Sequence, residues 1–182
     1  MKSLLSLLLV LLCTSFVCAD DHTGAECVAE KAEALRLKKL VKDTTQSPPT
    51  GEYYDMYSAI NGATAACQWA GLARSDAVSR GATAQQLAEG DGHMNSGSLK
   101  LTDAGTDSGL GDTAWAGAEW ALLSGDVCFA YNNWDDAWTE YKSAQQKYGY
   151  AAMDYANAKS DYNAAKGHFE NATASFDAIN PE

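Results

Sequence analysis

The chain has 182 residues, with 24 acidic and 13 basic side chains and a net charge of −11 at neutral pH. Such an acidic surface repels phosphate groups and anionic lipids, which argues against nucleic acid as a partner. The three histidines lack metal-ligand spacing, and no glycine-rich loop is followed by a phosphate-binding lysine, so we expect neither a metal nor another cofactor.

Residues 1–19 have the layout of a secretory signal peptide. Lys2 is followed by an apolar run over residues 4–12, and Val17 and Ala19 stand at the −3 and −1 positions of a cleavage site after Ala19. The removed segment holds one lysine and no acid, so the net charge of residues 20–182 is −12. The apolar run is marginal for a membrane span. We therefore expect an exported protein, secreted or periplasmic in a bacterium, with one domain over residues 20–182 and no stable membrane span after cleavage.

Two helices are predicted in the first half of this domain. Residues 26–42 form an amphipathic pattern with acids first and bases last, the order that the helix dipole favours. A linker rich in threonine and proline follows over residues 44–51. A second helix is expected over residues 52–88, with Thr50 as its N-cap and with many alanines and glycines along its length. The glycines weaken the prediction for its far half.

Residues 90–112 are rich in glycine, serine and aspartate and contain few apolar side chains. This composition predicts a long loop. Its aspartates do not have the spacing of an EF-hand calcium loop, so solvated acids are expected and weak calcium binding is the alternative. The aspartates are Asp91, Asp103, Asp107 and Asp112.

A third helix is expected over residues 113–179, because a large side chain returns there at every seventh position. A second line, mostly alanine, follows three residues after each large residue. Two lines with this spacing are typical of the a and d positions of a left-handed coiled coil. The predicted seam consists of Trp120, Val127, Trp134, Tyr141, Tyr148, Tyr155, Tyr162, Phe169 and Phe176.

A seam of rings requires a neighbour with small side chains, and the second helix offers alanine and glycine. We expect it to run antiparallel to the third helix, with the tyrosine hydroxyls reaching partners at the rim of the seam. The predicted fold is all-α, either an elongated helical hairpin or a three-helix bundle with coiled-coil-like heptad packing. The alternative places the seam between two parallel copies, where Asp154 would meet Lys159 and Asp161 would meet Lys166 of the other copy.

Three cysteines remain after cleavage, and an odd number leaves one thiol unpaired within the monomer. The predicted disulfide joins Cys67 and Cys128, because a chain that folds back brings them to similar heights. Cys27 is then the candidate for a bond between chains. Asn171 opens an Asn-Ala-Thr sequon, a candidate for N-glycosylation.

No catalytic constellation is evident, because Ser124 lacks the GxSxG context of a nucleophile and no histidine pairs with a cysteine by spacing. We therefore expect a non-enzymatic structural or assembly protein, a subunit of an extracellular filament, surface layer or scaffold. Its expected partner is a second copy or another extracellular protein. The alternative is a secreted helical binding module, either chaperone-like or a carrier of an apolar ligand between helices.

Overall fold

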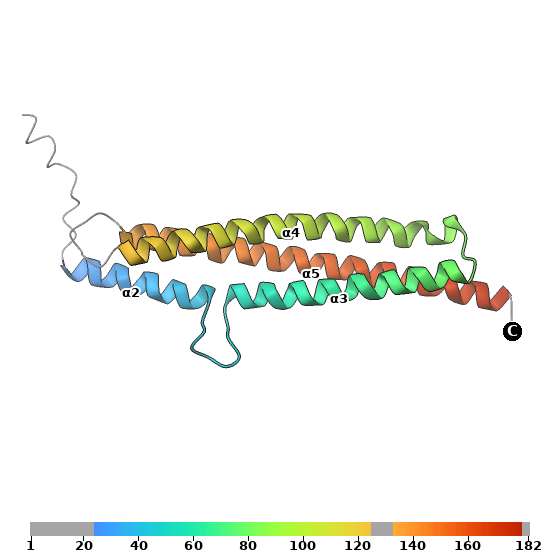
Figure 1. The fold of residues 1–182 in the computed structure, drawn as a ribbon, viewed down its shortest axis with the longest axis horizontal. Helices are drawn as coiled ribbons and strands as arrows, with labels where there is room; N and C mark the ends of the chain where they lie inside the picture. The colour runs from blue at the N-terminus through green and yellow to red at the C-terminus, as the bar shows by residue number, and fades with distance from the viewer. Residues whose placement is uncertain (1–23, 125–132, 180–182) are drawn as a thin grey trace, which may run out of the picture.

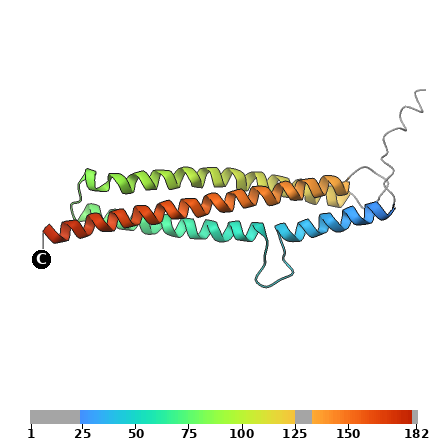
Figure 2. The same ribbon diagram turned by 180° about the vertical axis from the view of Figure 1, so that it is seen from behind.

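A computed structural model describes residues 24–124 and 133–179, which form four helices: α2 Gly24–Val41, α3 Glu52–Ser79, α4 Ala84–Ser124 and α5 Asn133–Ile179. The helices form a long bundle in which α2 and α3 lie end to end on one side and α4 lies on the other (Figure 1). Helix α5 runs antiparallel to α4 and contacts all three other helices, as the reverse view also shows (Figure 2). The predicted all-α class and bundle architecture are confirmed. The predicted signal peptide, residues 1–19, lies outside the described residues.

Three of the predicted element assignments are wrong. Residues 90–112, expected to be a loop, lie inside α4, and residues 113–179 are not one helix, because α4 ends at Ser124 and α5 begins at Asn133. The second helix ends at Ser79 rather than at residue 88. The chain therefore forms three long layers, with α2 and α3 sharing one of them. Helix α4 runs antiparallel to both α3 and α5, and α3 runs parallel to α5 (Figure 1), so the prediction that the second helix runs antiparallel to the ring-bearing helix is wrong.

The turn between α3 and α4 explains the early end of α3. Gly81 has a φ of 91°, a left-handed conformation that suits glycine. The backbone N–H of Thr83 donates to Gln86 Oε1 at 2.8 Å, and the N–H of Gln86 donates to Thr83 Oγ1 at 3.4 Å. This reciprocal arrangement is a capping box, which starts a new helix after the turn.

The junction between α2 and α3 is a loop that projects from the bundle (Figure 1). The backbones of Asp43 and Thr50 pair at its base, with N···O distances of 2.8 and 3.1 Å. Gly51 follows with a φ of 115°, and a Cβ atom there would lie 2.6 Å from the carbonyl oxygen of Leu40. Gly51, rather than the predicted Thr50, is the N-cap of α3, and no side chain bonds to the cap. The close approach to α2 accounts for the glycine.

The core is made of small residues and rings. Along α3 the buried residues Met56, Ala63, Ala70 and Ala77 recur with a seven-residue spacing, and α5 contributes buried alanines from Ala137 to Ala172 with the same spacing. Over residues 24–124 and 133–179, none of the helices combines the length and the hydrophobicity that crossing a membrane would require.

Candidate functional site

The ring line of α5 is buried inside a single chain. Tyr141, Tyr148, Tyr162 and Phe169 have no exposed surface, and Tyr155 is 8 % exposed. Val127 and the side chains of Trp134 and Phe176 lie outside the described residues. The assignment of Trp120 to the seam is wrong, because this residue belongs to α4 and is 72 % exposed. The seven-residue register of α5 does not extend back to Trp120, because the chain reverses its direction between α4 and α5.

Glycines of α4 face these rings. A Cβ atom on Gly90 would lie 2.4 Å from Phe169 Cε1, and one on Gly97 would lie 2.8 Å from Tyr162 Cε1. At Gly111 the distance to Tyr148 Cε1 would be 2.7 Å. Each of these distances is shorter than real Cβ contacts. The rings therefore occupy the space that a methyl group would need, and the predicted small partner surface belongs to α4 rather than to the second helix.

This glycine line has the same spacing as the ring line and the opposite direction. Seven residues forward in α4, from Gly90 to Gly97, correspond to seven residues backward in α5, from Phe169 to Tyr162. Buried alanines at residues 104 and 118 occupy the remaining positions of the α4 line. The seam is thus filled by α4 of the same chain. In the alternative of a parallel dimer, a second copy would fill it.

The hydroxyls of Tyr141, Tyr148 and Tyr162 reach polar partners, as expected for rings at a seam; that of Tyr162 lies 3.3 Å from Ser98 Oγ. Tyr148 donates to Asp112 Oδ1 at 2.7 Å, and Tyr141 donates to Glu119 Oε1 at 2.5 Å. Burial, and then the hydrogen bond to the carboxylate, raise the pKa of both phenols. These tyrosines therefore remain protonated where exposed tyrosines would ionise.

A lysine at the end of α2 lies among three aromatic rings. Lys42 Nζ is 3.8 Å from the ring centroid of Tyr53, 4.6 Å from that of Trp115 and 5.5 Å from that of Tyr148. Burial lowers the pKa of Lys42, and nearby acidic groups oppose that shift. The rings come from α3, α4 and α5, so this contact fixes the α2–α3 junction on the other two helices.

A histidine pair across α4 and α5 escaped the sequence analysis. The rings of His93 and His168 stack with centroids 5.3 Å apart. His168 Nδ1 lies 3.2 Å from Glu89, and His93 Nδ1 lies 3.8 Å from Asp161. The two histidines are too far apart in sequence for a spacing motif, and only the antiparallel register of the two helices could have indicated the pair.

No metal centre accompanies this pair or the aspartates of α4. In the described part of the chain, no three histidine, cysteine or acidic side chains are grouped to hold a metal ion. The aspartates have separate partners: Asp91 pairs with Arg74 at 2.6 Å and Asp107 pairs with Lys147 at 3.0 Å. They extend along a helix rather than converge in a loop, so calcium binding gains no support.

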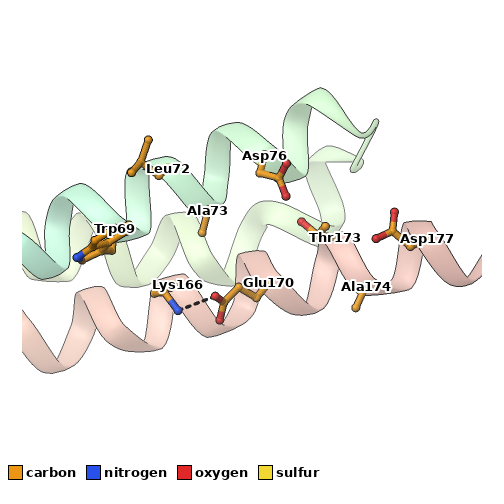
Figure 3. A pocket seen from close by; sticks show the side chains of 9 residues that line it. All are labelled: Trp69, Leu72, Ala73, Asp76, Lys166, Glu170, Thr173, Ala174 and Asp177. Carbon is orange, nitrogen blue, oxygen red and sulfur yellow. Dashed lines mark hydrogen bonds and ion pairs between the residues drawn. The ribbon is translucent and has the colours of Figure 1, made fainter.

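An open groove lies between α3 and α5 near the α3–α4 turn (Figure 3). It has a volume of about 370 Å³, and Trp69 and Leu72 on its α3 side are 60 % and 61 % exposed. These two side chains form an apolar surface that nothing else in the described chain covers. The groove is lined by Trp69, Leu72, Ala73, Asp76, Lys166, Glu170, Thr173, Ala174 and Asp177.

The charges around this groove are paired within the chain. Lys166 Nζ lies 2.5 Å from Glu170, the contact drawn in Figure 3. Arg80 is 2.9 Å from Asp177 and 3.3 Å from Asp76. The groove therefore has a more balanced charge than the acidic chain as a whole.

The other predicted site residues do not come together. Cys67 is a half-buried free thiol on α3, so the predicted disulfide is not formed at this residue. Its predicted partner Cys128, and the side chain of Cys27, lie outside the described residues. Asn171 is exposed on α5, where a sugar would meet no obstruction from the core.

No family model matches this chain, and no curated protein and no solved structure is similar to it. The geometry of the bundle and its surface is therefore the basis for a functional assignment.

Proposed function

We propose that the protein is an exported, non-enzymatic subunit of an extracellular filament, surface layer or scaffold, and that its copies associate through the α3–α5 groove. The observation that carries this proposal is the exposure of Trp69 and Leu72 beside the groove. Large apolar side chains that lie exposed beside a groove are typical of association sites.

Charge favours a second copy as the occupant. Two mature chains that each carry a net charge of −12 repel one another, and the repulsion is smallest where the local charges are already neutralised. The groove comes close to that condition, since Lys166 and Arg80 pair with its three acids. Small side chains at Ala73 and Ala174 also allow a second helix to approach closely.

The ring seam supports a mechanical role rather than the carrier alternative. A carrier needs space between its helices, but Phe169 and Tyr162 fill that space up to the glycines of α4. Repeated ring-on-glycine contacts along α5 hold two long helices together over most of their length. A stiff rod with an association surface near one end suits a subunit of a larger assembly.

The test is the sedimentation of the mature chain over a range of concentrations. We expect the wild type to self-associate and the double variant Trp69→Gln, Leu72→Gln to remain a monomer. Leu99→Gln is the matched control, because Leu99 is 69 % exposed on α4, away from the groove, and its replacement should leave association unchanged.

Reductant separates this surface from the candidate interchain thiol Cys27. If association persists in reductant and is lost in the groove variant, the result supports the groove as the association surface. A wild-type chain that stays monomeric at all concentrations, or association that Leu99→Gln removes as well as the groove variant, contradicts the proposal.

A further inference from the structure

We propose that residues 44–50 are a site of O-glycosylation, with sugar attached to the hydroxyls of Thr44, Ser47 and Thr50. The proposal rests on the export predicted from residues 1–19, because glycosyl transfer of this kind takes place on exported chains. It does not depend on the association surface between α3 and α5.

The position of this segment makes its hydroxyls accessible. The loop leaves the bundle between two helices that otherwise lie end to end, and it extends away from α4 and α5 (Figures 1 and 2). Every residue from 44 to 50 is exposed. Backbone pairing of Asp43 with Thr50 holds the base of the loop, so the exposed residues are presented on a defined stem.

The composition of the segment is typical of O-glycosylated chains. Four of its seven residues are serine or threonine and two are proline. Pro48 disfavours helical backbone at Ser47, so this hydroxyl is not held against a helix. The hydroxyl of Thr45 already donates to Asp43 Oδ1 at 2.5 Å and helps to fix the turn, so the other three are the proposed acceptors.

Exposed hydroxyls on α4 are different. The hydroxyls of Thr102, Thr106 and Thr113 each donate to the carbonyl oxygen four residues earlier, at 3.1, 3.1 and 2.9 Å. They are held against a helical backbone that cannot extend into an enzyme. Threonine therefore occurs in two structural contexts in this protein, and only the threonines of the loop suit glycosyl transfer.

The reaction is a substitution at the anomeric carbon of an activated sugar, a nucleotide sugar or a lipid-phosphate sugar. The hydroxyl oxygen forms a new bond to that carbon, and the bond from the carbon to the phosphate breaks. The phosphate leaves with the bonding electron pair, and a base of the transferase accepts the hydroxyl proton. No oxidant or reductant is needed.

The experiment is mass spectrometry of the full chain after passage through a eukaryotic secretory pathway. Asn171→Gln is introduced first, so that N-linked sugar does not contribute. Trypsin then releases residues 43–74 as one peptide, because no lysine or arginine lies between Lys42 and Arg74. This peptide also contains Ser58 and Thr64, which are exposed in α3 and act as internal controls. We expect mass increments of whole hexose or N-acetylhexosamine units only on those fragment ions of this peptide that contain residues 43–50.

Two triple variants complete the design. Thr44→Ala, Ser47→Ala, Thr50→Ala should remove the increments, and Thr102→Ala, Thr106→Ala, Thr113→Ala should leave them unchanged. An unmodified fragment 43–50 from the secreted chain, or sugar on Ser58 or Thr64 instead, overturns the proposal. A second expression, with the signal peptide of a protein secreted by the host in place of residues 1–19, tests the predicted export separately from the acceptor site. Sugar that appears only with the host signal peptide supports the site and overturns the predicted export.

Discussion

The two interfaces of α5 differ in the side chains that face it. On the α4 side, Gly90, Gly97 and Gly111 carry no side chain, and rings of α5 occupy the space above them. On the α3 side, Met56, Ala63, Ala70 and Ala77 keep their side chains, and part of the boundary remains open as a groove. One helix therefore has a closed interface on its α4 side and a partly open one on its α3 side.

This comparison assigns separate tasks to the two sides. Rings against glycine give a close contact whose geometry tolerates few changes, because interiors are packed to the density of crystals. The α3 side has small buried residues and large exposed ones, Trp69 and Leu72 among them. Mutations on the α4 side should therefore change the free energy of unfolding, and mutations at the groove should change association.

The largest effect is expected from Phe169→Ala. Phe169 is fully buried, and the opposing Gly90 has no side chain that could move into the cavity. We expect a loss of about 3–5 kcal/mol in the free energy of unfolding, measured by urea titration. Leu99→Ala on the exposed side of α4 should change it by less than about 0.5 kcal/mol. A loss below about 1 kcal/mol at Phe169 would contradict the closed packing of this interface.

The second largest effect is expected from alkaline pH, which should destabilise the same interface between α4 and α5. The pKa values of buried Tyr141 and Tyr148 are raised, so these groups stay protonated in the folded chain while they ionise in the unfolded chain near pH 10. Their contribution is fully present below that pH and is lost as the pH rises. Each phenol should lower the free energy of unfolding by about 1.4 kcal/mol per pH unit above it.

The measurement is the urea midpoint between neutral pH and pH values above the ordinary phenol pKa, with phenolate absorbance as a second signal. Tyr150→Phe, at a position that is 44 % exposed on α5, is the control for the loss of a hydroxyl. The double variant Tyr141→Phe, Tyr148→Phe should flatten the alkaline slope more than this control does. Equal slopes in all three chains would show that the buried phenols titrate freely.

Two glycines of α4 should respond to alanine in opposite directions. Gly97→Ala places a methyl group within 2.8 Å of a buried ring atom of Tyr162, whereas Gly105 has nothing within 4 Å of the same position. Overpacking at Gly97 should cost about 1–3 kcal/mol, less the gain in helix propensity. Gly105→Ala should stabilise the helix by up to about 1 kcal/mol. Thermal unfolding of the two variants checks the signs, and a stabilised Gly97→Ala would show that the ring moves aside easily.

The ring line and the extent of α4 show how far the sequence could be interpreted. The seven-residue recurrence from Tyr141 to Phe169 indicated a buried face correctly, since periodicity reflects burial. Residues 90–112 were misjudged because glycine, serine and aspartate have low helix propensity, and here the tertiary contact with the rings outweighs it. The missed signal was the seven-residue spacing from Gly90 to Gly97, which matches the spacing of the rings.

The end of the register at Trp120 has a related cause. Periodicity records which residues share a face, but not whether the chain reverses between them. Helix α4 ends at Ser124, and the next residue in the sequence is Gly125, a residue type of low helix propensity. The pairing of α4 with α5, the histidine pair and the groove all depend on this reversal, so none of them could be derived from a single continuous helix.

The smallest effect is expected at the ion pair that joins α3 to α4 directly. Arg74 Nε lies 2.6 Å from Asp91 Oδ1, but the two side chains are 44 % and 39 % exposed, so water and salt screen their attraction. Arg74→Gln should lower the free energy of unfolding by less than about 1 kcal/mol, and the difference should shrink as salt is added. Urea titrations at low and high salt measure it, with Arg36→Gln, in a pair within α2, as the control. A loss comparable to that of Phe169→Ala would mean that surface charge, rather than ring packing on glycine, determines how the three layers hold together.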